Sequence, residues 1–354
     1  MIVYIVMAFL ATLITYLAEK FKAKNSNGPY KVAMFIVFLV LTIVSAIRFN
    51  VGTDYTHTYM PTYYDVLYDV ANIRFDIIPL LILKAVVSLG LSAQWFFVAT
   101  SIFINAVIVK TIMDQSKNKA LSIFLYIAGQ LYFFGMNGIR QCMAIALFYY
   151  SLKYIEQKNF KKYLLINLMG AACHLSALLF VPLFFVLNRK IKKKTILVLI
   201  CLSYLSLGLL TAIFKMVMLS TKYGIYVDGT TDYEAISTFN TAAILNFIIL
   251  IILMIMKRQN EDVGRTYINL HFIATIASLF LITIPLANRL FISFRQIQIL
   301  SVPEVMNNVS LKGKKALLAY VFVISLYCAY FYIAVGIQNQ NEVLPYKTIL
   351  SEGF

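Results

Sequence analysis

Long apolar runs separated by short polar loops constrain this chain more than any other feature of its sequence. A helix that crosses a bilayer needs about 20 mostly apolar residues, so each run of nearly that length is a candidate transmembrane helix. Only 13% of the residues are charged, whereas soluble domains carry roughly a quarter. This excludes a soluble enzyme, a nucleic-acid-binding protein and a disordered scaffold, and it predicts an all-α, polytopic membrane protein with about 10–12 transmembrane helices. The runs lie near residues 2–18, 32–47, 93–112, 120–134, 138–155, 195–219, 241–256, 266–284, 287–305 and 315–336.

Clusters of basic residues predict how the helices are oriented. Of the 31 lysines and arginines, 22 lie in six clusters. By the positive-inside rule these clusters are cytoplasmic, which places both termini outside. The net charge of +16 therefore indicates membrane orientation and no nucleic-acid partner. The clusters are residues 19–31, 110–119, 153–162, 189–194, 257–265 and 312–315.

Two further apolar segments do not fit simple crossings. Residues 163–187 have basic residues at both ends, so a single crossing is excluded and we predict a broken or re-entrant hairpin with its turn at residues 173–176. Residues 77–92 are predicted to be re-entrant or to lie at the outer interface. Irregular backbone at membrane depth survives only where protein or water satisfies its polar groups, so both breaks indicate an internal cavity. No linker or repeat divides the chain, which predicts a single integral membrane domain, 1–354.

The predicted outer loops, residues 48–76 and 220–240, interleave tyrosines with carboxylates. Tyr55 and Tyr59 are candidate sugar-binding residues, because rings stack on the apolar faces of sugars while carboxylates accept hydrogen bonds from hydroxyls. An aromatic belt at the membrane interface explains the same tyrosines, and the sequence leaves both interpretations open. Asp54 is the candidate catalytic carboxylate, since Gly52 permits a tight turn beside it. The other acids of this loop are expected to be solvated.

Four arginines lie within or at the ends of apolar segments. Arginine suits phosphate because its planar guanidinium donates two parallel hydrogen bonds and stays charged. We therefore predict a diphosphate site, to which a helix start near Arg140 adds the positive end of the helix dipole. Alternatively, each side chain extends to lipid headgroups or pairs with an aspartate. The candidate diphosphate ligands are Arg48, Arg140, Arg289 and Arg295, and the neighbouring candidates for substrate binding are Asn137, Gln141 and Gln296.

His174 stands at the turn of the predicted hairpin, two residues before Ser176, a further candidate for substrate binding. A histidine titrates near neutral pH and can act as a general base. The alternative is a buried histidine that only donates a hydrogen bond within the core. The sequence contains no recognisable metal or nucleotide motif, so we predict metal-independent chemistry without a cofactor.

These segments together resemble the EpsG-type branch of the Wzy-like polysaccharide polymerases. The resemblance rests on Arg48–Tyr55 (RFNVGTDY) with Tyr59, on Asn137–Gln141 (NGIRQ) with Ala144, and on His174–Ala177 (HLSA). The late segment with Arg289 and Arg295 is also similar to the family pattern. One departure is Phe75–Pro79 (FDIIP), where the family pattern has a glutamate–proline pair.

The resemblance implies a GT-C-like helical bundle and a glycosyltransferase that builds O-antigen, capsule or exopolysaccharide. Such an enzyme transfers a growing glycan from undecaprenyl diphosphate to a hydroxyl of the next lipid-linked repeat unit, at the outer face of the bacterial cytoplasmic membrane. Arg140 and Arg295 would then clamp the diphosphate, and His174 or Asp54 would accept the hydroxyl proton. The implied partners are the undecaprenyl-diphosphate-linked oligosaccharide, membrane lipids and a chain-length regulator.

Two other functions remain open. A flippase for lipid-linked oligosaccharide also needs cationic cavities and broken helices, although it usually has two related halves that this sequence lacks. A membrane acyltransferase or ligase that decorates glycans is the second alternative. An acyltransferase would need a histidine on an early helix, and residues 1–47 contain none.

Overall fold

The structure, a computed structural model, describes residues 1–220, 240–256, 264–279, 287–308 and 313–350. Its described residues form helices and no strand, apart from one isolated bridge between Arg48 and Thr348. The predicted all-α class is therefore confirmed. The chain divides into two compact units, Met1–Val186 with Lys312–Phe354 and Leu187–Leu311, which are described separately below. The prediction of a single membrane domain stays a prediction beside this division.

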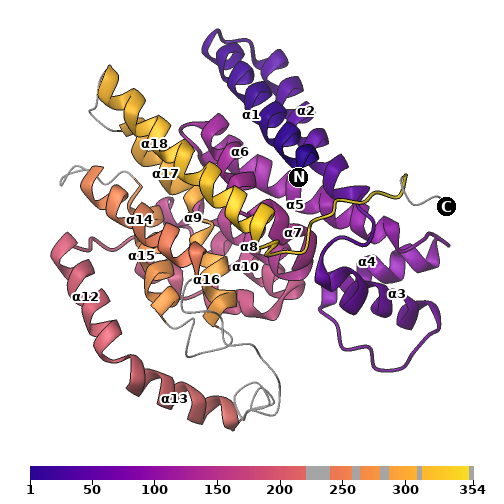
Figure 1. Cartoon of the computed structure of the whole chain (residues 1–354). Helices are drawn as coiled ribbons and strands as arrows, with labels where there is room; N and C mark the ends of the chain where they lie inside the picture. The colour runs from indigo at the N-terminus through magenta and orange to yellow at the C-terminus, as the bar shows by residue number, and fades with distance from the viewer. Residues whose placement is uncertain (221–239, 257–263, 280–286, 309–312, 351–354) are drawn as a thin grey trace. The chain divides into compact units, whose positions relative to one another are not determined.

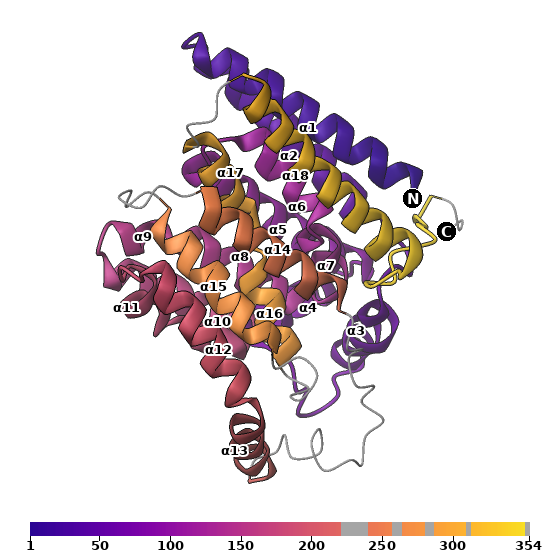
Figure 2. The ribbon, with the colours of Figure 1, turned by 60° about the vertical axis from the view of Figure 1, so that its left-hand side comes forward.

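The first unit is a bundle in which most of the closely packed helix pairs are not adjacent in sequence. Helix α1 packs on α2 and α6, and further pairs are α2 with α5, α5 with α8, α8 with α10, and α6 with α18. Figures 1 and 2 show α1 and α2 side by side along their length. The helices are α1 (Ile2–Ala23), α2 (Asn27–Ala46), α3 (Met60–Leu67), α4 (Ile77–Ser88), α5 (Gln94–Gln115), α6 (Lys119–Ala128), α7 (Leu131–Asn137), α8 (Ile139–Ser151), α9 (Lys153–Glu156), α10 (Phe160–Cys173), α11 (Leu183–Leu187) and α18 (Lys314–Phe331), with η1 (Tyr55–Tyr59), η2 (Leu175–Phe180) and η4 (Tyr332–Ile337).

Helix α1 shows why these segments are membrane helices. Its buried residues, Tyr4, Met7, Ala11, Thr15 and Ala18, recur every three or four positions and form one face. The remaining faces are also apolar and expose large side chains to the surroundings. A helix that is apolar on every side fits a hydrocarbon environment and not water.

Four of the described helical segments are long and apolar enough to cross a membrane: α1, α2, α5 and residues 316–337. Two bent pairs, α6 with α7 at 47° and residues 194–205 with 207–217 at 63°, raise this number to six. The chain is therefore a multi-pass membrane protein, and by length and composition the described residues contain at most six of the ten full crossings expected from the apolar runs. The runs are interrupted: residues 120–134 break at Gln130, which has a φ of +78°, and residues 138–155 divide into α8 and α9.

The hairpin predicted for residues 163–187 is confirmed. Helix α10 ends at Cys173, and His174 has an extended backbone (φ −162°, ψ 123°) before η2 begins. The returning segment lies against the start of α10, because Tyr163 Oη donates to the carbonyl of Phe180 at 2.6 Å and the ring of Phe160 contacts Phe184 at 5.1 Å. The 77–92 segment forms α4, whose 12 residues are too few for a full crossing.

The second unit contains α12 (Lys193–Leu205), α13 (Leu207–Leu219), α14 (Thr241–Met256), α15 (Arg265–Leu279), α16 (Ala287–Arg295) and α17 (Gln298–Asn308). Polar side chains join α14, α15 and α17: Asn246 Nδ2 donates to Thr275 Oγ1 at 2.8 Å, and Gln298 Nε2 donates to Asn246 Oδ1 at 3.3 Å. His271 is buried beside them, with Nε2 at 2.9 Å from the carbonyl of Asn246. The predicted outer loop 220–240 falls almost entirely outside the described residues.

Candidate active site

The loop after α2 is held against the break between α7 and α8. Gly52 has a φ of +95°, and a Cβ on it would lie 3.0 Å from the carbonyl oxygen of Met136 on α7. The amide of Asp54 donates to Asn137 Oδ1 at 2.9 Å. Glycine is required at position 52 because both the backbone conformation and the close approach disfavour a side chain. The loop therefore enters the bundle at the point where α8 begins.

Tyr59 connects this loop to both sides of the break. Its hydroxyl accepts a hydrogen bond from the amide of Ile139 at 2.9 Å and donates one to the carbonyl of Asn137 at 3.0 Å. Tyr55 is also buried, and its ring stacks on Phe97 with centroids 4.3 Å apart. The two tyrosines thus have packing roles in this structure, and their predicted contact with sugars stays a prediction.

Arg48 is completely buried where α2, α5 and α7 meet. Its guanidinium donates to the carbonyl of Ser45, to Ser101 Oγ at 3.4 Å and to the carbonyl of Met136 at 3.2 Å, and it lies 4.9 Å from the centre of the Phe97 ring. Through these contacts Arg48 links α2, α5 and α7. Its predicted role in diphosphate binding stays a prediction, and this burial does not favour it.

Three ionisable side chains converge beside the same break. Asp76 Oδ2 accepts a hydrogen bond from Arg140 at 2.9 Å and lies 3.2 Å from His174 Nδ1. The Arg140 side chain is 27% exposed, and those of Asp76 and His174 are 17% exposed. The charges are thus neither sealed in the core nor dispersed in solvent, which leaves room for a ligand to reach them.

The ends of three helices position this cluster. Asp76 immediately precedes α4, Arg140 lies in the first turn of α8, and His174 follows the last residue of α10. The amide of His174 closes α10 with a 2.8 Å hydrogen bond to the carbonyl of Gly170. The Phe75 ring lies 4.6 Å from the Arg140 guanidinium and covers one side of it. The arrangement combines a partly exposed arginine with a histidine whose second ring nitrogen, Nε2, is separate from the aspartate contact.

The state of the carboxylate follows from its neighbours. Burial raises the pKa of Asp76, but the hydrogen bonds and charges of His174 and Arg140 outweigh burial and lower this pKa below its ordinary value. Asp76 is therefore ionised throughout the physiological pH range. It is the residue that sequence reasoning missed, since the acids of this loop other than Asp54 were expected to be solvated. The available signals were its place directly before an apolar helix and its departure from the family's glutamate–proline pattern.

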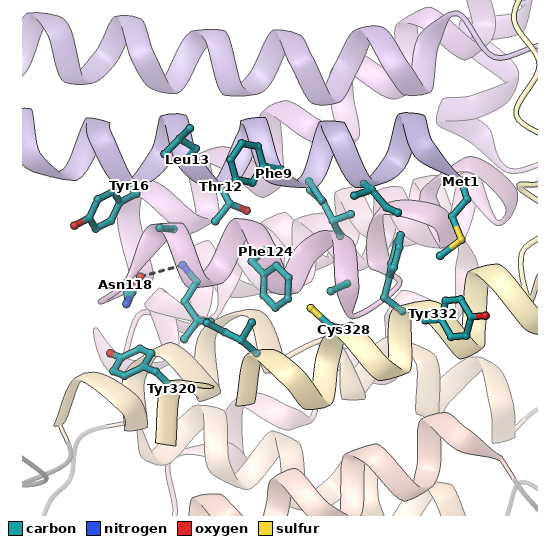
Figure 3. Close-up of a pocket in the computed structure, with 18 residues that line it drawn as sticks. Met1, Phe9, Thr12, Leu13, Tyr16, Asn118, Phe124, Tyr320, Cys328 and Tyr332 are labelled. Carbon is teal, nitrogen blue, oxygen red and sulfur yellow. Dashed lines mark hydrogen bonds between the residues drawn. The ribbon is translucent and has the colours of Figure 1, made fainter. Parts of the chain in front are cut away.

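A large groove lies elsewhere in the first unit, between α1, α6 and α18, with a volume of about 800 Å³ (Figure 3). Phe9 and Leu13 from α1, Phe124 from α6 and Cys328 from α18 line it. None of its described lining residues carries a charged side chain. The groove therefore offers a surface for hydrocarbon, and the cluster of Asp76, Arg140 and His174 is the candidate site for chemistry.

A comparison with protein families matches residues 31–348 to the EpsG family. The chain belongs to the EpsG family. The match includes the loop after α2, the break before α8, and all three members of the ionisable cluster. No curated protein and no solved structure matches the chain. Membership of the EpsG family assigns the chain a role in membrane polysaccharide biosynthesis and confirms the resemblance seen in its sequence.

The first unit of this EpsG-family chain also contains Asp54, Gln141 and Ser176, which the sequence predicts for the site. Asp54 is half-buried and Thr58 donates to its carboxylate at 3.5 Å, while Gln141 is buried on α8. The Ser176 hydroxyl is buried on η2. Their predicted roles stay predictions.

The second unit contains the other predicted ligands. Arg295 and Gln296 are buried at the end of α16, where the Arg295 guanidinium lies 5.8 Å from the centre of the Phe291 ring. The side chain of Arg289 lies outside the described residues. The joint action of Arg140 and Arg295 stays a prediction, because these residues belong to different units. Within the described ranges no three histidine, cysteine or acidic side chains form a metal-ligating group, and metal independence also stays a prediction.

Proposed function

We propose that this EpsG-family chain is a Wzy-type polysaccharide polymerase. It transfers a growing glycan from undecaprenyl diphosphate to a hydroxyl of the next lipid-linked repeat unit, at the outer face of the bacterial cytoplasmic membrane. The observation that supports this most is the meeting of Arg140, Asp76 and His174 within the family-matched region. A cation for the leaving diphosphate and a base for the attacking hydroxyl are the two groups that such a transfer needs.

Arg140 is the proposed ligand of the donor diphosphate. A guanidinium has five N–H donors, so a bond to Asp76 leaves others for phosphate oxygens. Its place in the first turn of the 13-residue helix α8 adds the positive end of the helix dipole. Negative charge builds up on the diphosphate as it leaves, and a fixed cation at that position stabilises the transition state more than the ground state.

His174 is the proposed general base. In the transfer step, the acceptor hydroxyl gives its proton to Nε2 of His174 while its oxygen forms a bond to the anomeric carbon of the donor glycan. The bond between that carbon and the diphosphate oxygen breaks, and its electron pair leaves with the diphosphate. Hydrolysis of a nucleotide is not required, because the glycosyl diphosphate is itself an activated donor.

The size distribution of lipid-linked and surface glycan tests the function in cells that lack the protein. We expect single repeat units to accumulate and the ladder of longer glycans to return with the wild-type gene. Arg140→Ala and Arg140→Lys should both fail to restore the ladder at normal protein level, because lysine keeps the charge but lacks the planar fork. Arg74→Ala is the matched control, since Arg74 is an exposed arginine of the loop that carries Asp76, and it should restore the ladder fully.

Other outcomes would contradict the proposal. A normal ladder that lacks an acyl group would indicate a decorating enzyme, and repeat units retained on the cytoplasmic face would indicate a flippase. A full ladder from Arg140→Lys would overturn the bidentate role of Arg140 while leaving polymerisation itself intact.

A further inference from the structure

One carboxylate oxygen, Oδ2 of Asp76, contacts both proposed functional groups. It accepts from a terminal nitrogen of Arg140 at 2.9 Å and lies 3.2 Å from Nδ1 of His174. The two partners are 64 and 98 residues away in sequence, so the contact depends on the packing of α4 against α10 and of α10 against α8. A single group therefore sets the positions of the cation and of the base relative to each other.

We propose that Asp76 is a positioning residue that holds His174 with Nδ1 protonated and Nε2 free, and that orients the Arg140 guanidinium in the same contact. The proposal rests on the proposed function and assigns a role to a residue that this function does not use directly. A carboxylate can only accept, so the Nδ1 it contacts must carry the proton. In the neutral ring this leaves the lone pair on Nε2, where a base needs it.

A purely structural ion pair does not account for this geometry as well. The side chains of this cluster are 17–27% exposed, so a ligand can reach them, and one oxygen of Asp76 contacts both the proposed cation and the proposed base. The charged groups that the structure sets beside His174 are Asp76 before α4 and Arg140 on α8, and the neighbouring titratable group on α10 is Cys173. Of these groups, only Asp76 is an anion that can accept a hydrogen bond from an imidazole N–H.

Nitrogen NMR of the purified, histidine-labelled full chain in lipid nanodiscs tests the tautomer directly. The sequence has only three histidines, so the His174→Gln variant identifies the signal of His174. We expect a protonated Nδ1 and an unprotonated Nε2 in the neutral wild type. Asp76→Ala should abolish this preference, and Asp76→Glu should restore it. Asp69→Asn removes an exposed carboxylate from the same loop and should change nothing.

Activity of the same variants provides the second readout. Asp76→Ala should lower the rate of glycan transfer by about 100-fold or more, the usual contribution of general-base catalysis, and Asp76→Glu should recover part of it. A wild-type His174 protonated on Nε2, or a tautomer that is indifferent to residue 76, would overturn the positioning role. Failure of the proposed function gives a different result. If His174→Gln is active, His174 is not the general base, whichever tautomer the NMR spectrum shows.

Discussion

The hydroxyl group of Tyr59 forms hydrogen bonds with two backbone groups at the break before α8, the Ile139 amide and the Asn137 carbonyl. Tyr59→Phe leaves the Ile139 amide and the Asn137 carbonyl without this partner in a buried place. Leaving buried backbone groups unpaired costs about 1–3 kcal/mol, so we expect a lower melting temperature in detergent. Tyr68→Phe is the control, since Tyr68 is 74% exposed, and it should melt like the wild type. An unchanged melting temperature for Tyr59→Phe would contradict the assigned hydrogen bonds.

The contacts of Asp76 predict a pH dependence of stability. Its pKa is lower in the folded chain than its ordinary value of 3.8, because the effects of His174 and Arg140 outweigh burial. The stabilisation is therefore complete above that ordinary value and is lost as the pH falls through the lower, folded-state value. We expect the difference in melting temperature between wild type and Asp76→Asn to persist above about pH 5 and to shrink below about pH 4. A difference that disappears already near pH 6 would show that another group is responsible.

The role of a residue could be predicted from the sequence only where its neighbours in the sequence indicated that role. Arg140 beside glycines and His174 at a chain break were both identifiable. Asp76 was not, because its partners lie 64 and 98 residues away and its own surroundings show only an acid before an apolar run. Likewise, Arg48 was predicted as a ligand because nothing local shows that α5 and α7 enclose it.

At the scale of elements, the docking of the loop after α2 depends on Gly52. Gly52→Ala places a methyl group 3.0 Å from the Met136 carbonyl oxygen at a φ of +95°. We expect a loss of about 1–3 kcal/mol from this backbone strain, seen as a lower melting temperature, together with reduced glycan length in cells. Gly28→Ala is the matched control, because a Cβ at Gly28 meets no atom within 4 Å. Equal melting temperatures and equal glycan lengths for the two variants would show that the loop does not depend on the close contact between Gly52 and Met136.

Helix breaks differed in how far the sequence predicted them. The turn at His174 followed from basic residues at both ends of one apolar segment, which a single crossing cannot accommodate. The bend between α6 and α7 was not predicted, because residues 120–134 are apolar on both sides of Gly129 and Gln130. Hydropathy averages over such a bend, so it predicts that a segment is apolar but not that it is straight.

For the whole molecule, the distribution of basic residues predicts which loops face the cytoplasm. We expect a membrane-impermeant maleimide to label Tyr68→Cys in intact cells and to leave Lys158→Cys unlabelled until the cells are opened. Both positions are exposed loop residues, one in the acidic loop after α3 and one in a basic cluster. The unaltered chain gives the background, because its four cysteines lie in apolar segments. Labelling of Lys158→Cys in intact cells would reverse the predicted orientation.

The division into two compact units was not visible in the sequence, because the basic clusters beside residues 186–187 and 311–312 resemble those between the other apolar runs. The fold class, by contrast, could be predicted from the composition and from the length of the apolar runs alone. Runs of this length satisfy their backbone hydrogen bonds in a bilayer by forming helices.

Glycan elongation by the purified chain is the measurement that tests the central claim most directly. Wild-type protein and the Arg140→Lys, His174→Gln and Arg74→Ala variants would be reconstituted in vesicles with lipid-linked repeat units and no nucleotide. We predict a ladder of longer glycans from wild type and Arg74→Ala, and only single units from the other two variants. A wild-type chain that folds, retains the lipid-linked units and yet forms no longer product would contradict the polymerase assignment.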